Sequence, residues 1–153
     1  MSSTLAVSFG FHPYFRIPGG REWQIRLPAM SLLLLDERSI PTGEKASVPA
    51  FVGKLGGRAF DHGFALRDPH AGFLIAGNRR LITVEFLEGY PYAQVFAPRG
   101  KDYIAIEPMT APTNALMSGR GLRLVEAGDL FRATFRAKVQ EMPSLESIIP
   151  RTT

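Results

Sequence analysis

A run of ten residues near the C-terminal end, Leu130–Val139, most constrains what this chain can fold into. It reads LFRATFRAKV, and apolar and polar side chains alternate along it. Successive side chains of a β-strand point to opposite faces, so the pattern predicts a strand with one buried and one solvated face. No window of similar length has the 3.6-residue apolar period of a helix. The residues expected to face a core are Phe131, Ala133, Phe135, Ala137 and Val139.

Shorter strands are predicted along the rest of the chain. Its 153 residues include 15 glycines and 12 prolines, which are spread over the whole length and separate short apolar segments. This spacing is typical of an all-β protein, and it favours an antiparallel β-sandwich or barrel. The predicted strands are Trp23–Leu27, Leu32–Leu35, Leu81–Leu87, Tyr92–Ala97, Tyr103–Glu107 and Leu122–Val125.

The connections follow from the turn-forming residues. Hairpin turns are expected at Gly89–Pro91 and Pro98–Asp102, and Glu126–Asp129 is expected to join Leu122–Val125 to the strand that begins at Leu130. Residues 39–63 are rich in glycine and proline and are predicted to form a long loop, with a turn at 56–60. We expect a single sandwich domain over residues 1–140, followed by a tail over residues 141–153.

Composition limits the kinds of partner. Apolar residues make up 45% and charged residues 21%, the balance of a soluble globular protein. The absence of cysteine excludes disulfides and thiol chemistry. The first residues have no signal-peptide pattern, and Leu32–Leu35 is too short to span a membrane. The net charge is +4, and the basic residues are scattered along the chain. This distribution does not favour nucleic acid as a partner, while an anionic ligand is still compatible with it. A cytoplasmic location is predicted.

The candidate chemical groups are His12, Asp61 and Glu107, each predicted to lie near the end of a strand. Glu107 follows an apolar strand, and Pro108, which lacks an N–H, is expected to end the ladder there. A carboxylate that is partly desolvated at such a place has a raised pKa and can act as a base near neutral pH. The alternative is a solvated glutamate at the start of a loop.

The other candidates also have two interpretations. His12 lies among aromatic residues and is either a packing histidine or a group that changes charge near neutral pH. Asp61 is either a polar group of a site or a turn former. His62 and His70 lie in loop-like contexts and receive no role. The three histidines lack metal-ligand spacing, so no metal site is predicted. Trp23, in an alternating strand, is assigned to the core rather than to sugar stacking.

Five short motifs, taken together, resemble the aldose 1-epimerase (galactose mutarotase) family. Each motif alone is weak, but their order and spacing agree with the family from Val7 to Val139. The motifs are GFHPYF at 10–15, LDERSIPTGE at 35–44, FDHGF at 60–64, IEPMTAPTNAL at 106–116 and LVEAGDLFRATFRAKV at 124–139.

The resemblance implies a mutarotase-like β-sandwich with an open carbohydrate cleft and no metal or organic cofactor. It implies that Glu107 is the general base, that His12 is the general acid and that Asp61 binds sugar hydroxyls. The implied activity is interconversion of the α and β anomers of a hexose. The alternatives are a hexose-6-phosphate 1-epimerase, a non-catalytic carbohydrate-binding domain and an assembly partner. Residues that could bind the phosphate are Arg16, Arg58 and Arg67.

The resemblance covers only the C-terminal part of the family pattern. The sandwich is therefore expected to be incomplete at its N-terminal side, with strand edges or apolar positions left uncovered. Uncovered edges and apolar patches promote association. We expect the chain to self-associate or to pair with an N-terminal half.

Overall fold

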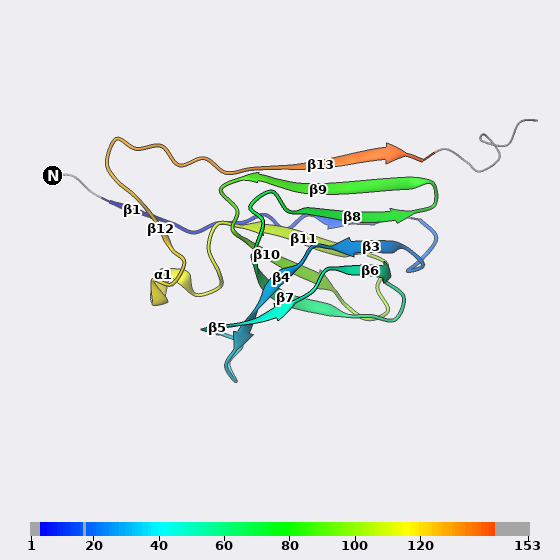
Figure 1. Cartoon of the computed structure of the whole chain (residues 1–153), viewed down its shortest axis with the longest axis horizontal. Coiled ribbons are helices and arrows are strands. Elements are labelled where there is room, and N and C mark those ends of the chain that lie inside the picture. The colour runs from blue at the N-terminus through cyan, green and yellow to red at the C-terminus, as the bar shows by residue number, and fades with distance from the viewer. Residues whose placement is uncertain (1–3, 17, 143–153) are drawn as a thin grey trace, which may run out of the picture.

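The structure is a computed structural model that describes residues 4–16 and 18–142. It consists of two facing β-sheets, a short two-stranded ribbon and one helical turn (Figure 1). The elements are β1 (Leu5–Val7), β2 (Tyr14–Phe15), β3 (Gln24–Leu27), β4 (Met30–Leu35), β5 (Pro41–Val48), β6 (Phe51–Lys54), β7 (Phe60–Leu66), β8 (Gly72–Gly77), β9 (Arg80–Glu88), β10 (Tyr92–Ala97), β11 (Ile104–Met109), α1 (Ala115–Ser118), β12 (Arg123–Val125) and β13 (Thr134–Glu141).

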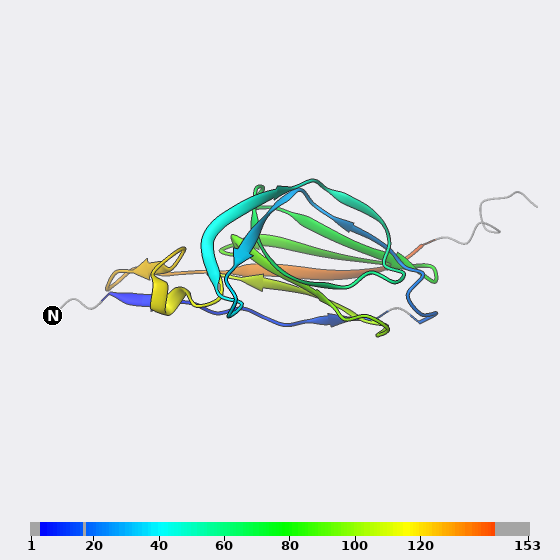
Figure 2. The same cartoon turned by 90° about the horizontal axis from the view of Figure 1, so that it is seen from below.

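The two main sheets are antiparallel throughout. One has the strand order β2-β11-β10-β7-β4-β5, and the other has the order β13-β9-β8-β3-β6. Figure 2 shows the sheets as two layers, with the β1–β12 ribbon and α1 projecting at one end. The prediction of an all-β antiparallel sandwich is confirmed.

The core lies between the two sheets and is built by alternation along the strands. On β9, Ile82, Val84 and Phe86 are buried, while the residues between them are only half-buried. Trp23, just before β3, is 2% exposed and belongs to this core, as predicted. The second sheet contributes Val95, and also Ile104 and Ile106, from its inner face. Its other face is thereby free to carry polar side chains.

Most of the predicted strands are present. Strand β10 has the predicted bounds, Tyr92–Ala97, and the turn at 98–102 joins it to its hydrogen-bonded neighbour β11. The turn over residues 56–60 also forms, because the N–H of Arg58 donates to the carbonyl of Leu55 over 2.9 Å. The predicted tail begins inside β13, which ends at Glu141, and its residues 143–153 lie outside the described part of the chain.

The prediction of a long loop over residues 39–63 is wrong. The segment contains β5, β6 and the start of β7. Both β5 and β6 are edge strands, and β5 exposes polar side chains such as Glu44 and Lys45. Edge strands carry charge and need little buried surface, so their apolar alternation is weak. The many glycines and prolines of residues 39–63 therefore suggested a loop, although most of the backbone there is paired in strands.

Two predicted hairpins are also wrong. Residues 89–91 connect β9 to β10, which lie in different sheets, so this turn crosses the sandwich. The turn at Glu126–Asp129 does form, with the N–H of Asp129 donating to the carbonyl of Glu126 over 3.0 Å. However, β12 pairs with β1 rather than with β13, and Val125 lies opposite Leu5. The residues of a turn are recognised from the local sequence, whereas the strand that pairs with a given strand is determined by contacts across the whole fold.

The long alternating run is only partly buried. Phe131, Ala133 and Phe135 are half-buried as predicted, but Ala137 and Val139 are exposed, Val139 by 64%. The reason is that β13 is an edge strand and the facing edge strand β2 has only two residues. The far half of β13 therefore faces solvent. Exposed apolar side chains of this kind favour association, and self-association of the chain stays a prediction.

Candidate active site

A cavity of about 370 Å³ lies on the outer face of the six-stranded sheet. This volume is in the range of small-ligand sites, about 300–1,000 Å³. The cavity brings together all three residues singled out from the sequence. Its lining consists of His12, Tyr14, Asp61, Gln94, Phe96, Glu107, Met109 and Thr113.

Strand register explains why these side chains meet. Gln94 on β10 lies opposite Glu107 on β11 and opposite Gly63 on β7, while Phe96 lies opposite Asp61. Directly opposed residues of antiparallel strands share a face of the sheet. The apolar residues between them point to the core, so the alternation that buries one face places both carboxylates on the other.

The segment before His12 is fastened to β11. The hydroxyl of Thr110 accepts from the N–H of Phe9 over 2.9 Å, and the Thr110 N–H donates to the Phe9 carbonyl over 2.9 Å. A Cβ on Gly10 would lie 2.8 Å from the carbonyl oxygen of Pro108, which is too close for any side chain. The close approach of the two backbones holds His12 beside β11.

Pro108 does not end the ladder, contrary to prediction. Strand β11 continues to Met109, and Pro108 lies opposite Ala93. The Pro108 carbonyl accepts from the N–H of Phe11 over 3.1 Å. The N and O of one residue face the same neighbour in an antiparallel strand, so the missing N–H lies on the side of residues 9–11. Pairing there is limited to a single bridge between Gly10 and Met109, so a proline is tolerated.

Glu107 therefore lies inside β11 and contacts His12. The Nε2 atom of His12 lies 2.9 Å from Oε1 of Glu107. The imidazole side chain is 48% exposed, whereas the carboxylate is 12% exposed. The two atoms are as close as in an ion pair. Because Oε1 has no hydrogen-bond partner within the described residues, the contact does not have the angles of a hydrogen bond. The ring of Tyr14 lies against the imidazole, with centroids 4.5 Å apart.

Burial changes the acidity of Glu107. Desolvation raises the pKa of this carboxyl; the neighbouring His12 opposes the rise, and the negative charge of Asp61 adds to it. The protonated form is thus favoured more than in a solvent-exposed glutamate. A carboxyl group with such a pKa ionises closer to neutral pH, and a pKa near the operating pH is the one best suited to acid–base catalysis.

This pKa shift predicts the pH dependence of folding stability. Since the pKa of Glu107 is raised in the folded state, ionising it costs folding free energy. The cost is absent below the unfolded pKa and is complete above the folded pKa. We expect Glu107→Gln to unfold at a higher temperature than the wild type at pH 8, and at an equal temperature at about pH 3.

Thermal unfolding followed by circular dichroism at both pH values measures this difference. Glu85→Gln is a suitable control because Glu85 lies on the other sheet, on β9, and pairs with Arg136 over 2.8 Å. A lower unfolding temperature for Glu107→Gln at pH 8 would mean that the His12 contact outweighs the cost of burying the carboxylate.

Asp61 lies within β7 and is not a turn former. The amide of Gln94 donates from Nε2 to Oδ1 of Asp61 over 2.8 Å. His62 is in the same strand rather than in a loop, and its Nδ1 accepts from the N–H of Asp61 over 3.1 Å. A Cβ on Gly63 would lie 3.2 Å from Oε1 of Gln94, so the glycine makes room for the Gln94 side chain. Asp61 and Gln94 thus form one hydrogen-bonded pair on the cavity floor.

Gln94 and several other lining residues were not found from the sequence. A signal existed for two of them, because the alternation of YAQVFA on β10 places Gln94 and Phe96 on one face, opposite the buried Val95. Their proximity to Glu107 depends on register between strands, which the sequence pattern does not contain. Thr113 lies in an irregular segment before α1, with no pattern to identify it.

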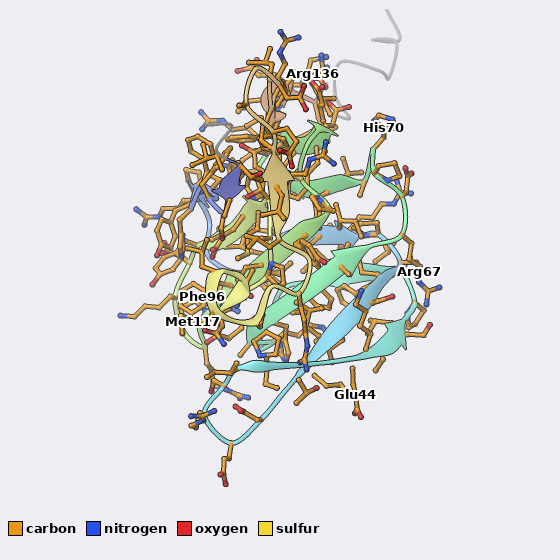
Figure 3. The ribbon with its side chains drawn as sticks, turned by 90° about the vertical axis from the view of Figure 1, so that its left-hand side faces the viewer. Glu44, Arg67, His70, Phe96, Met117 and Arg136 are labelled. Carbon is orange, nitrogen blue, oxygen red and sulfur yellow. The ribbon has the colours of Figure 1, made fainter. Side chains whose placement is uncertain are left out.

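The three arginines considered for phosphate binding lie elsewhere. Arg16 forms an ion pair with Asp102 over 2.6 Å. The guanidinium of Arg58 lies over the ring of Phe51, 4.7 Å from its centroid. Figure 3 shows Arg67 pointing outward, on the side of the molecule away from Phe96. None of the three lines the cavity.

The described part of the chain contains neither a metal-binding cluster nor a helix that could span a membrane. No group of three or more histidine, aspartate or glutamate side chains in residues 4–16 and 18–142 is arranged to hold a metal ion. In the same residues, no helix has the length and apolar character needed to cross a membrane.

Comparison with known proteins identifies the family to which the chain belongs. A family model described as aldose 1-epimerase matches residues 2–138. The uncharacterized protein YihR of Escherichia coli K12 is 27% identical over 143 residues, which are 86% of this chain and 46% of that protein.

Solved structures agree with the fold. A galactose mutarotase-like protein from Clostridium acetobutylicum superposes with a TM-score of 0.73 at 19% identity, covering 91% of this chain and 49% of that one. The Slr1438 protein of Synechocystis has a TM-score of 0.65 at 28% identity, covering 90% of this chain and 46% of that one. The chain thus spans about half the length of the relatives that it matches. Since the family model matches nearly the whole chain, the chain belongs to the aldose 1-epimerase family.

Proposed function

We propose that this chain interconverts the α and β anomers of a neutral hexose, with Glu107 as general base, His12 as general acid and Asp61 as a sugar-binding group. The observation that carries the proposal is the contact of 2.9 Å between His12 and Glu107 in a cavity that also contains the Asp61–Gln94 pair. A carboxylate and an imidazole side by side can take up and donate a proton in one step.

The reaction requires two proton transfers at one hemiacetal. Glu107 removes the proton of the C1 hydroxyl while His12 protonates the ring oxygen, and the bond between C1 and the ring oxygen breaks. The open-chain aldehyde rotates about the C1–C2 bond, and the ring oxygen then attacks the other face of C1. In this closing step the two residues exchange roles, so that protons and charges balance over the cycle.

The misalignment of the His12–Glu107 contact is compatible with this role. Catalytic hydrogen bonds are often poorly aligned without substrate and tighten only when substrate binds. The unsatisfied Oε1 atom of Glu107 is costly to bury, and a hydrogen bond to it would recover part of that cost. A small shift of the half-exposed His12 ring on substrate binding would supply it.

The charges around the cavity favour a neutral sugar over a phosphorylated one. The lining contains two carboxylates, Asp61 and Glu107, and it contains neither lysine nor arginine. A phosphate group placed there would be repelled by both carboxylates and would have no lysine or arginine of the lining to pair with. This supports an aldose 1-epimerase rather than a hexose-6-phosphate 1-epimerase.

Polarimetry on freshly dissolved α-anomers tests the proposal. We expect optical rotation of glucose or galactose to reach equilibrium faster with the protein than in buffer, and the same protein to accelerate glucose 6-phosphate less. Sugar binding without acceleration would leave a non-catalytic carbohydrate-binding domain. Preference for the phosphorylated sugar would contradict the argument from charge.

A further prediction concerns Gln94. Because its amide holds Asp61 over 2.8 Å, Gln94→Leu should leave that carboxylate free to rotate away from the sugar hydroxyls. We expect KM to rise by about tenfold, with a smaller change in kcat, because a lost hydrogen bond to a charged group is worth about 1.5–3 kcal/mol. Gln94→Asn, which shortens the side chain but keeps the amide, is the matched control. An equal loss in kcat and kcat/KM would instead place Gln94 in the chemical step.

A further inference from the structure

The backbone around His12 does little to fix the orientation of its imidazole. His12 lies between the bridge at Gly10 and the first residue of β2, Tyr14, and is not itself in a strand. Its side chain is 48% exposed, and its contact of 2.9 Å with Glu107 does not have the angles of a hydrogen bond. A half-exposed side chain without a directional bond samples several rotamers. A ring held only by this contact would rotate away from the carboxylate.

The ring of Tyr14 supplies a further restraint. Its centroid lies 4.5 Å from that of the imidazole, and the two planes are inclined by 30°. Offset stacking at such a separation is one of the preferred arrangements of aromatic pairs. Residues two apart in an extended segment share a face, and Pro13 between them fixes one backbone angle of the linker. The phenol oxygen of Tyr14 lies 3.5 Å from Nε2 of His12, which is long for a hydrogen bond, so the stacked rings contribute more than the hydroxyl.

Tyr14 is in turn supported by Tyr103. The two rings meet edge to face, with centroids 5.2 Å apart and planes at 89°. Tyr14 is 58% exposed, and its backbone is paired with Ala105 of β11, two residues after Tyr103. Tyr14 lines the cavity, whereas Tyr103 is not among the described residues that line it. The imidazole is thus attached to β11 twice, once through Glu107 and once through the two tyrosines.

We propose that Tyr14, supported by Tyr103, is a positioning residue that holds the imidazole of His12 against Glu107. The inference rests on the proposed function, in which His12 delivers a proton to the ring oxygen of the sugar. A misplacement of about 1 Å can cost a hundredfold in rate, so the orientation of Nε2 affects the chemical step. A restraint that acts through His12 should therefore change kcat, whereas a tyrosine that only contacts the sugar should change KM.

Proton NMR of the histidine rings tests the support independently of turnover. The face of an aromatic ring shifts the C–H signals of a ring stacked on it upfield, and comparison with His12→Asn identifies the signals of His12 among those of the three histidines. We expect these signals to move downfield in Tyr14→Leu and to stay close to their wild-type positions in Tyr14→Phe, which keeps the aromatic ring. Unchanged signals in Tyr14→Leu would overturn the proposal.

Polarimetry measures the consequence for the reaction. We expect Tyr14→Leu to lower kcat by about tenfold and to change KM by less than about twofold, the scale on which a well-formed aromatic pair contributes. Tyr14→Phe should keep most of the activity because the stack remains. Tyr103→Leu should lower kcat by about threefold, although Tyr103 is outside the cavity lining, because Tyr14 loses its support. A rise in KM with unchanged kcat in Tyr14→Leu would make Tyr14 a sugar contact and overturn the positioning role.

Phe11→Leu is the matched control. Phe11 is an exposed aromatic residue (52%) directly before His12, and its ring packs on Phe135 of the other sheet, with centroids 5.3 Å apart. Its substitution disturbs the same segment but leaves the stack of Tyr14 on His12, so kcat and the His12 signals should not change. A loss of kcat as large as that of Tyr14→Leu would show that any disturbance of the segment is sufficient, which overturns a specific role for Tyr14.

The two measurements separate this inference from the proposed function. If the wild type accelerates no sugar, the proposed function fails, and the His12 signals alone decide whether Tyr14 holds the imidazole. If the wild type is active and Tyr14→Leu keeps its kcat, the function stands and the positioning role fails, even where the signals move.

Discussion

Glu107→Gln is expected to reduce mutarotase turnover by about a hundredfold or more, the usual scale for removing a positioned acid–base group. The amide has nearly the same shape as the carboxylate and can still hydrogen-bond a sugar hydroxyl, but it cannot accept the C1 hydroxyl proton. Sugar affinity should therefore change little while kcat falls. Polarimetry on α-glucose and α-galactose, with calorimetry of a methyl glycoside, separates the two quantities.

The pH profile adds a second readout for the same residue. The ionised carboxylate is the active form, so kcat/KM should rise with pH through the pKa of Glu107. Burial raises that pKa, and so the acidic limb should lie above the range of an ordinary glutamate. Glu85→Gln, on the other sheet, should leave both turnover and the limb unchanged. Near-normal turnover of Glu107→Gln would remove Glu107 from the role of base.

The sequence predicted strands well where burial is one-sided and poorly where it is weak. Strand β9 alternates fully because Ile82, Val84 and Phe86 enter the core, and its pattern alone identified it. Strand β5 has no such pattern, since it is an edge strand whose residues are mostly polar and exposed. The alternation of apolar residues indicates which strands face the core. An edge strand can be fully paired through its backbone and still show little alternation.

The candidate site could be predicted in part. His12, Asp61 and Glu107 were found through short motifs, and the structure brings all three to one cavity. Gln94 was missed because its role depends on register, which puts it opposite Glu107 on one side and Gly63 on the other. The burial of Glu107 also depends on the contact with His12, across 95 residues of sequence, and no local pattern contains such a contact.

His12→Asn is expected to lower turnover by about a hundredfold while leaving the fold intact. The acid role needs a ring that gains and loses a proton, which the amide of asparagine cannot do at accessible pH. The fold should tolerate the change because the imidazole is about half exposed and the segment before it is held by backbone bonds to Thr110 and Pro108. Activity per folded molecule and melting temperature are the two measurements, made on the same preparation.

The two measurements decide between the catalytic and the packing interpretations of this residue. A catalytic His12 gives a large loss of activity with a small change in melting temperature. A packing His12, held between Tyr14 and Phe96, gives a lower melting temperature with unchanged activity per folded molecule. His70→Asn is the control, because His70 lies in a turn and points outward in Figure 3, far from the cavity. His12→Asn should keep the acidic limb of the pH profile, because that limb is set by Glu107. Loss of the acidic limb instead would assign the base role to the imidazole and reverse the proposed pair.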